Sequence, residues 1–350
     1  MSPSVRVVSH GLACPLGLTT DTAVAALHAG IRPLVESERI LDGAGEPARG
    51  FMLGRLPEDA PRCERALTLA RFALTEACAP LAAERSGAVP CFLALPEPGP
   101  GPTFELPSVE RTLAEVVRGA TGGLGLEIGP RRVFPRGRAG ALLALQAAVS
   151  ALMRGEHAVA LVGGLDSQVD LVTLQALADG DHLLCRRNRD GLLPGEGAAF
   201  VLLANPRAVG ADRAIAHVTA CAVATEPNPR GQGGPSQATG LTAVFHELRS
   251  QHPGRVDVVV SGQTGESGYE RGFSYAYLRN ATLMPEPLRT LVLGARLGDT
   301  GAAAAAMALV VAIAGLRPPR ALPWRAPRAG TALVHAESDD GTVGGCIVVR

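Results

Sequence analysis

Short aliphatic runs alternate along this chain with longer segments in which apolar residues recur every three or four positions. The aliphatic runs predict strands, at residues 5–9, 158–163, 199–204, 256–261, 291–294 and 346–349. The periodic segments predict helices, at residues 20–29, 65–79, 109–118, 139–154, 240–250 and 302–314. This alternation favours a layered α/β fold, and the Pro-rich stretches 92–106 and 316–329 predict loops.

Two of the predicted helices, at residues 139–152 and 301–315, are apolar on every side. A helix without a polar face must be buried all round, and its small side chains would let two such helices approach closely. A similar turn opens each helix, Gly-Arg-Ala-Gly at 137–140 and Gly-Asp-Thr-Gly at 298–301. This faint internal repeat predicts two halves, residues 1–206 and 207–350.

Composition narrows the class of protein. A chain of 350 residues can form one large domain or two packed halves, and its 33 basic and 33 acidic residues leave no net charge to attract nucleic acid or an anionic membrane. The seven cysteines are scattered, without metal-ligand spacing or a disulfide framework, so we expect no metal and no cofactor. The longest apolar stretch, 301–315, is too short for a membrane span, and no secretory signal is visible, so we expect a cytoplasmic protein.

Several stretches, in chain order, resemble the motifs of β-ketoacyl synthases. The opening strand and its turn lie at residues 8–17, and an "A-L-x-x-G-x-x-x-x-A-L-V-G-G" segment lies at residues 151–164. An "R-x-G-x-x-x-G-E-G-A-A" segment lies at residues 188–199. Residues 298–303 stand where the family has "G-H-x-x-x-A-A", and a glycine-rich loop lies at residues 341–345. The resemblance implies the thiolase fold, an α/β architecture of two pseudo-symmetric βαβαβαββ halves in five α-β-α-β-α layers. It also implies a dimer that pairs across an extended central sheet.

The same resemblance implies a nucleophilic cysteine at a helix N-terminus and two histidines that assist decarboxylation. The position of the cysteine falls on Arg138, that of the first histidine on Gly262 beside Gln263, and that of the second on Asp299. An arginine is always cationic and is no nucleophile, and neither Gly262 nor Gln263 can shuttle a proton at neutral pH. We therefore expect the usual condensing activity to be absent.

The replacing residues suggest their own chemistry. Arg138, Asp299 and Glu266 should converge on the former acyl pocket, where an unpaired buried charge costs several kcal/mol. We hypothesise an Arg138–Asp299 ion pair that plugs this pocket. The alternative is that Arg138 polarises an anionic carbonyl substrate while the carboxylates perform acid–base work.

Further pocket candidates are Ser167, Glu196, Gly344 and Gly345. Ser167 and Glu196 are expected to satisfy loop amides. The two glycines either present backbone N–H groups to a thioester oxygen or let buried helices pack, and the sequence leaves both interpretations open. The segment 265–279 holds all three tyrosines and is either a binding surface or a helix packed over the pocket.

Three functions agree with these residues. The first is a non-condensing protein of fatty-acid or polyketide type, a partner or scaffold like the chain-length factors, in a homodimer or a heterodimer with a ketosynthase. The second is an acyltransferase-type enzyme that uses Arg138 and Asp299 on an acyl thioester or an acyl carrier protein. The third is an adaptor for a protein partner in a secretion system.

Overall fold

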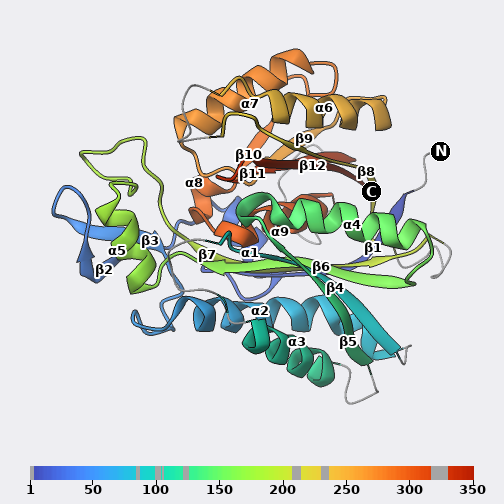
Figure 1. Ribbon diagram of the computed structural model, residues 1–350, viewed down its shortest axis with the longest axis horizontal. Coiled ribbons are helices and arrows are strands. Elements are labelled where there is room, and N and C mark those ends of the chain that lie inside the picture. Colours follow the sequence, from blue (N-terminus) through green and yellow to red (C-terminus); the bar gives the residue numbers. More distant parts are fainter. Residues whose placement is uncertain are drawn as a thin grey trace.

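Ten strands form one continuous sheet in the computed structural model, which describes residues 4–83, 87–98, 104, 106–120, 126–206, 214–229, 236–316 and 330–350 (Figure 1). Five strands come from the first part of the chain: β1 (Val5–Ala13), β4 (Gly87–Leu95), β5 (Leu126–Pro135), β6 (Val159–Ser167) and β7 (Glu196–Ala204). Five come from the second part: β8 (Ala216–Thr225), β9 (Val258–Ser261), β10 (Thr290–Val292), β11 (Thr331–Glu337) and β12 (Thr342–Val349).

The two sets of strands repeat one topology. The spatial order is β1-β7-β6-β4-β5 in the first set and β8-β12-β11-β9-β10 in the second. In the first set the pairs β1–β7 and β7–β6 are antiparallel, and β6–β4 and β4–β5 are parallel. In the second set the equivalent pairs β8–β12 and β12–β11 are antiparallel, and β11–β9 and β9–β10 are parallel. The sets join where β1 pairs with β8 through Val5–Val7 and Ala216–Val218. The internal repeat is therefore present in the topology, while the boundary at residue 206 stays a prediction.

Helices cover the sheet in layers (Figure 1). The helices α2 (Arg62–Cys78) and α3 (Leu106–Ala120) lie outside the first set of strands, and α6 (Thr239–Gln251) and α7 (Ser267–Arg279) lie outside the second. Between the sets lie α4 (Gly140–Met153) and α9 (Ala304–Gly315), which contact strands of both. The result is the five-layer α-β-α-β-α arrangement of the thiolase fold.

The two central helices are buried because their side chains are almost all apolar. In α9 every residue from Ala304 to Ile313 is buried, and α4 buries a wide face of alanine and leucine. Both faces of the adjacent strands β6 and β7 are covered as well, so these strands are continuous apolar runs.

Each central helix begins with a short 3₁₀ turn, η2 (Gly137–Ala139) before α4 and η4 (Gly301–Ala303) before α9. The first residue of each turn has a positive φ, +55° at Gly137 and +51° at Gly301, which glycine adopts without steric cost. The predicted equivalence of residues 137–140 with 298–301 is therefore wrong by three residues, because Gly301 and not Gly298 opens the second turn.

Six further elements complete the described part of the fold. They are α1 (Thr20–His28), β2 (Leu34–Leu41), β3 (Pro47–Phe51), η1 (Ala79–Ala83), α5 (Leu171–Asp179) and α8 (Gly294–Leu297). The β2–β3 pair and α5 project together at one end of the molecule and share a small apolar cluster of their own (Figure 1).

The predicted helices all form, and α7 confirms the helical interpretation of residues 265–279. The strands β2, β3, β4, β5, β8 and β11 were not predicted. The loop predicted at 92–106 is wrong at both ends, because Phe92–Leu95 are buried in β4 and α3 begins at Leu106. The loop predicted at 316–329 lies, after Leu316, outside the described residues. Within the described part of the chain, no helix has the length and apolar character to cross a membrane.

Buried His335 on β11 generates a prediction about stability. Its ring stacks on Phe273 with centroids 5.2 Å apart, and neither ring nitrogen has a hydrogen-bond partner. Burial lowers the pKa of His335 to about 3. Below about pH 6.5 the imidazole is therefore protonated in the unfolded chain but stays neutral in the folded chain. Stability should therefore fall as the pH drops from about 6.5 towards 3.

The variant His335→Phe should raise the free energy of unfolding by about 1–3 kcal/mol at neutral pH, because two unsatisfied polar atoms leave the core. It should also flatten the loss of stability in acid. Urea unfolding between about pH 5 and 7.5 measures both effects, with the exposed His28→Phe as the matched control. Equal behaviour of the two variants would contradict the prediction.

Candidate functional site

Arg138 lies in the 3₁₀ turn η2, at the start of the central helix α4, and its side chain is buried, with 6% of the residue exposed. Its Nη1 donates to Oδ2 of Asp299 at 3.1 Å, and Asp299 is 2% exposed. The hypothesised Arg138–Asp299 ion pair is thus present.

Two residues that the sequence did not single out complete the surroundings of Arg138. Asp339, in the turn between β11 and β12, accepts from Nη1 at 3.1 Å and from Nη2 at 2.6 Å. Tyr269 of α7 accepts from Nη2 at 2.9 Å and donates its own hydroxyl hydrogen to Asp339 at 2.6 Å. The guanidinium is therefore held by two carboxylates and a phenol, and only its Nε lacks a partner.

These contacts fix the charge of the site. Burial by itself lowers the pKa of Arg138, but Asp299, Tyr269, Asp339 and Glu266 outweigh burial and hold that pKa well above the usual arginine range. Burial, followed by the neighbouring Asp339, raises the pKa of Tyr269. Arg138 is therefore a permanent cation and Tyr269 a neutral phenol.

Asp299 also caps the start of η4, the 3₁₀ turn that leads into α9. Its Oδ1 accepts from the backbone N–H of Gly301 at 2.9 Å, and Asp166 of β6 accepts from the N–H of Ala302 at 2.9 Å. Asp166 is paired in turn with Arg62 through two hydrogen bonds of 2.9 and 3.1 Å. Negative groups at a helix N-terminus are favourable, so both carboxylates have a structural task at the start of η4 and α9.

The turn at Ser338–Gly341 closes over the start of α4. Ser338 accepts from the N–H of Ala139 at 2.8 Å and donates to the carbonyl oxygen of Arg136. The next two residues pair with the arginines on either side of Gly137: Asp339 with Arg138 at 2.6 Å, and Asp340 with Arg136 at 2.9 Å.

The other predicted residues lie beside this cluster. The N–H of Gly262 donates to the carbonyl oxygen of His335 at 2.9 Å, and a Cβ at Gly262 would lie 3.2 Å from the Cβ of Ala336. Gln263 donates to the carbonyl oxygen of Tyr269 at 3.1 Å and to Glu337 at 3.2 Å.

Glu266 immediately precedes α7. It accepts from the Thr264 hydroxyl at 2.6 Å and contributes to the electrostatic environment of Arg138. Arg138, Gln263, Glu266 and Asp299 are therefore brought into one region around Tyr269, whereas a side chain at Gly262 would meet Ala336 and Ala304.

Glu337, at the end of β11, is a carboxyl group of this region whose pKa is raised. Burial raises its pKa to about 7, Glu226 adds to this effect, and the hydrogen bond from Gln263 and the charge of Arg138 oppose it. No sequence pattern pointed to Glu337, because an isolated glutamate after an apolar run is usually solvated.

The remaining pocket candidates are engaged in structure. Glu196 forms a buried ion pair with Arg65, through bonds of 2.9 Å from Nε and Nη2, and accepts from Ser167 at 2.9 Å and from the N–H of Leu53 at 2.6 Å. A Cβ at Gly344 would lie 2.6 Å from the Cβ of Leu142 on α4, and one at Gly345 would lie 2.9 Å from Val244 on α6. For these two glycines the structure gives a packing reason.

The cysteines offer no substitute nucleophile at this site. Cys14, directly after β1, and Cys346, in β12, are fully buried. Burial raises the pKa of Cys14 to about 11 and that of Cys221 to about 12, so neither forms the reactive thiolate at neutral pH. No group of three or more metal-ligating side chains gathers anywhere in the described ranges.

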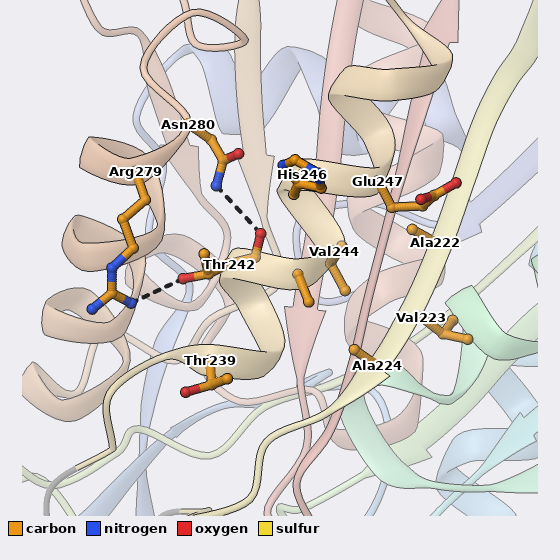
Figure 2. Close-up of a pocket in the computed structure, with 11 residues that line it drawn as sticks. Ala222, Val223, Ala224, Thr239, Thr242, Val244, His246, Glu247, Arg279 and Asn280 are labelled. Carbon is orange, nitrogen blue, oxygen red and sulfur yellow. Dashed lines mark hydrogen bonds between the residues drawn. The ribbon is translucent and has the colours of Figure 1, made fainter.

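A surface pocket of about 610 Å³ lies at the other end of α7, between α6, β8 and Arg279–Asn280. Figure 2 shows Arg279 donating to the hydroxyl of Thr242 and Asn280 donating to its carbonyl oxygen, at 3.1 and 3.3 Å. Its lining is of mixed charge, with Arg279 and Glu247, and does not include the Arg138 cluster.

The Arg138–Asp299 pair leads to a prediction about energetic coupling. Arg138→Met alone should cost about 3–5 kcal/mol of unfolding free energy, because it leaves the buried carboxylate of Asp299 without its cation. Asp299→Asn alone should cost less, because Asp339 still pairs with Arg138. The double variant should be clearly more stable than the sum of the two losses implies, since the introduced asparagine can still accept from Gly301. Urea unfolding of the four proteins measures the coupling. The exposed pair Arg154–Glu156 is the matched control and should show little or no coupling, because water screens both charges.

The raised pKa of Glu337 leads to a prediction with the opposite pH dependence to that of His335. The unfolded chain loses this proton near pH 4.5 and the folded chain only near pH 7, so stability should fall as the pH rises between these values. Glu337→Gln should remove that fall and gain about 1–3 kcal/mol at about pH 8. Urea unfolding across this range is the measurement, with the exposed Glu38→Gln as the control. An unchanged slope in Glu337→Gln would contradict the assignment.

Comparison with known proteins agrees with the fold described above. Residues 137–208 match the family model of the beta-ketoacyl synthase N-terminal domain. Comparison with curated protein sequences gives no match.

Solved structures match along the whole chain. A ketosynthase from module 6 of the bacillaene synthase of Bacillus subtilis 168 has a TM-score of 0.71 at 14% identity, over 99% of this chain and 72% of that one. The AntDE:AntF complex, a type II polyketide synthase acyl-carrier protein with its ketosynthase bound to the hexaketide, gives 0.76 at 14% identity over 100% of both chains. The ishigamide ketosynthase/chain length factor gives 0.71 at 17% identity, again over 100% of both. The chain therefore has the thiolase fold in its ketosynthase form, and its residues 137–208 match the N-terminal domain of the beta-ketoacyl synthases.

Proposed function

We propose that this chain is a ketosynthase-like protein of fatty-acid or polyketide type that does not condense acyl thioesters and acts as the partner subunit of an active ketosynthase. The observation that carries the proposal is the state of Arg138. At the helix start where the family resemblance places a nucleophilic cysteine, the chain has a buried cation bonded to Asp299, Asp339 and Tyr269.

The chemistry of condensation is missing at each of the three positions. The guanidinium of Arg138 has no lone pair to attack a thioester. Gly262 has no side chain, and Asp299 is occupied by Arg138 and by the N–H of Gly301. An imidazole that could stabilise an enolate oxygen is therefore absent from both of the positions that the resemblance assigns to histidine.

A subunit role is supported by the length of the match and by the edge of the sheet. The chain covers 100% of a ketosynthase/chain length factor chain. In the described part of the chain the sheet ends in β5 on the side of the first set and in β10 on the side of the second, and an edge strand can pair with a second subunit. We propose that β5 forms this interface, in a homodimer or in a heterodimer with a ketosynthase.

One observation favours a second candidate, an acyltransferase-type enzyme that uses Arg138 and Asp299 on an acyl thioester. Glu337 has a pKa of about 7, which suits a general acid or base at neutral pH, and it is linked through Gln263 to Tyr269. In this scheme Arg138 would polarise a carbonyl oxygen. This second function requires that Arg138 separate from its carboxylate partners when a substrate binds.

Incubation of the purified chain with acetyl and malonyl thioesters tests the proposal. Intact-protein mass spectrometry should show no acyl adduct, and parallel assays should show no released thiol or carbon dioxide above the level of the Arg138→Met variant. Turnover by the unaltered chain that is lost in Arg138→Met and Asp299→Asn would contradict the partner role and support the second candidate. The exposed Arg154→Met is the control for nonspecific effects of removing an arginine.

A further inference from the structure

The contact between Arg138 and Asp339 has the form of a ligand complex within one chain. Arginine binds a carboxylate best through two parallel N–H···O bonds, and Asp339 presents Oδ2 to Nη1 at 3.1 Å and Oδ1 to Nη2 at 2.6 Å. The Tyr269 hydroxyl adds a third donor at 2.6 Å. The receiving groups are buried, with Arg138 6% and Tyr269 6% exposed.

The carboxylate itself is not buried with its receptor. The side chain of Asp339 is 56% exposed, whereas that of Asp299, on the same guanidinium, is 1% exposed. The Asp339 carboxylate can therefore leave Arg138 for water by a side-chain rotation, without disturbing the core. Asp299 cannot, because it also caps Gly301.

Like charges around the turn favour this departure. Asp340 follows Asp339 directly, and Glu97 lies against Gly137, where a Cβ would come within 2.6 Å of its Oε1. Burial, and after it Asp339 and Asp340, raise the pKa of Glu97, while Arg138 and the backbone N–H of Asp340 oppose this effect. Arg138 also keeps one buried donor, Nε, without a partner.

We infer that Arg138 and Tyr269 form a binding site for a small-molecule carboxylate, and that Asp339 fills this site as a built-in ligand. An external carboxylate takes the place of Asp339 when that side chain turns into solvent. The inference concerns the pocket of the proposed function but does not need the partner role, since binding requires no turnover.

Chemical rescue tests the inference. Asp339→Ala removes the built-in carboxylate, which should lower the melting temperature and leave the receptor vacant. Sodium acetate, up to about 100 mM, should then raise the melting temperature of this variant along a saturable curve by about 3 °C or more. Sodium chloride at equal ionic strength should not. The unaltered chain should show less than a third of the shift, because its tethered Asp339 competes.

Two further variants separate binding from general salt effects. Asp340→Ala removes a carboxylate from the same turn, one that pairs with the exposed Arg136, and should show no rescue. Asp339→Ala combined with Arg138→Met should also show none. The melting-temperature shifts with formate, acetate and propionate then measure the size of the space that the Asp339 carboxylate leaves.

The absence of a saturable acetate effect in Asp339→Ala, or an equal effect in Asp340→Ala, would overturn the inference. Where Asp339→Ala does not fold, Asp339→Ser purified with and without acetate replaces it. Folding that depends on acetate supports the site, and failure to fold with acetate counts against it. Condensing activity in the thioester assay would overturn the proposed function and leave this result unaffected.

Discussion

The buried guanidinium of Arg138 is the interaction on which the centre of this molecule depends. It joins the start of α4 to Asp299 before α9, to Tyr269 on α7 and to Asp339 between β11 and β12. These partners are 131 to 201 residues away in the chain. An arginine transferred from water to such a site loses hydration worth several kcal/mol, so the fold must supply the acceptors in advance. The positions of four separate elements are coupled in this way through one side chain.

The side chains that cap the two central helices also connect the two halves of the chain. Asp166, at the end of β6 in the first half, accepts from the N–H of Ala302 at the start of the second half's helix. Ser338, after β11 in the second half, accepts from the N–H of Ala139 at the start of the first half's helix. Because β6 and β11 are equivalent strands of the repeat, the caps are exchanged pseudo-symmetrically. Each central helix relies on the other half to satisfy one of its first N–H groups, which argues that the halves fold as one unit.

The sequence predicted the central helices and one buried ion pair, but it missed several strands and two partners of Arg138. Helices that are apolar on all sides can only be buried, so the central helices followed from elementary physics. The Arg138–Asp299 contact was predicted because the ketosynthase resemblance places both residues in one pocket, where opposite buried charges must pair. Strands β4 and β8 were missed because proline, glycine and polar neighbours interrupt their apolar runs. Tyr269 and Asp339 could not be found, because only the folded chain brings a tyrosine on an outer helix and an aspartate in an exposed turn to the same guanidinium.

The electrostatics of a helix start explain why Arg138 needs acidic partners. The N-terminus of α4 carries the positive end of the helix dipole, which stabilises a thiolate and disfavours a cation by about 0.3–1 kcal/mol. An arginine introduced there without partners would add this cost to that of desolvation. Asp299 and Asp339 offset both costs, and Asp299 also caps Gly301 of the second central helix. The arginine and its two acids are therefore one coordinated arrangement, in which the carboxylates balance both the buried guanidinium and the positive end of a helix.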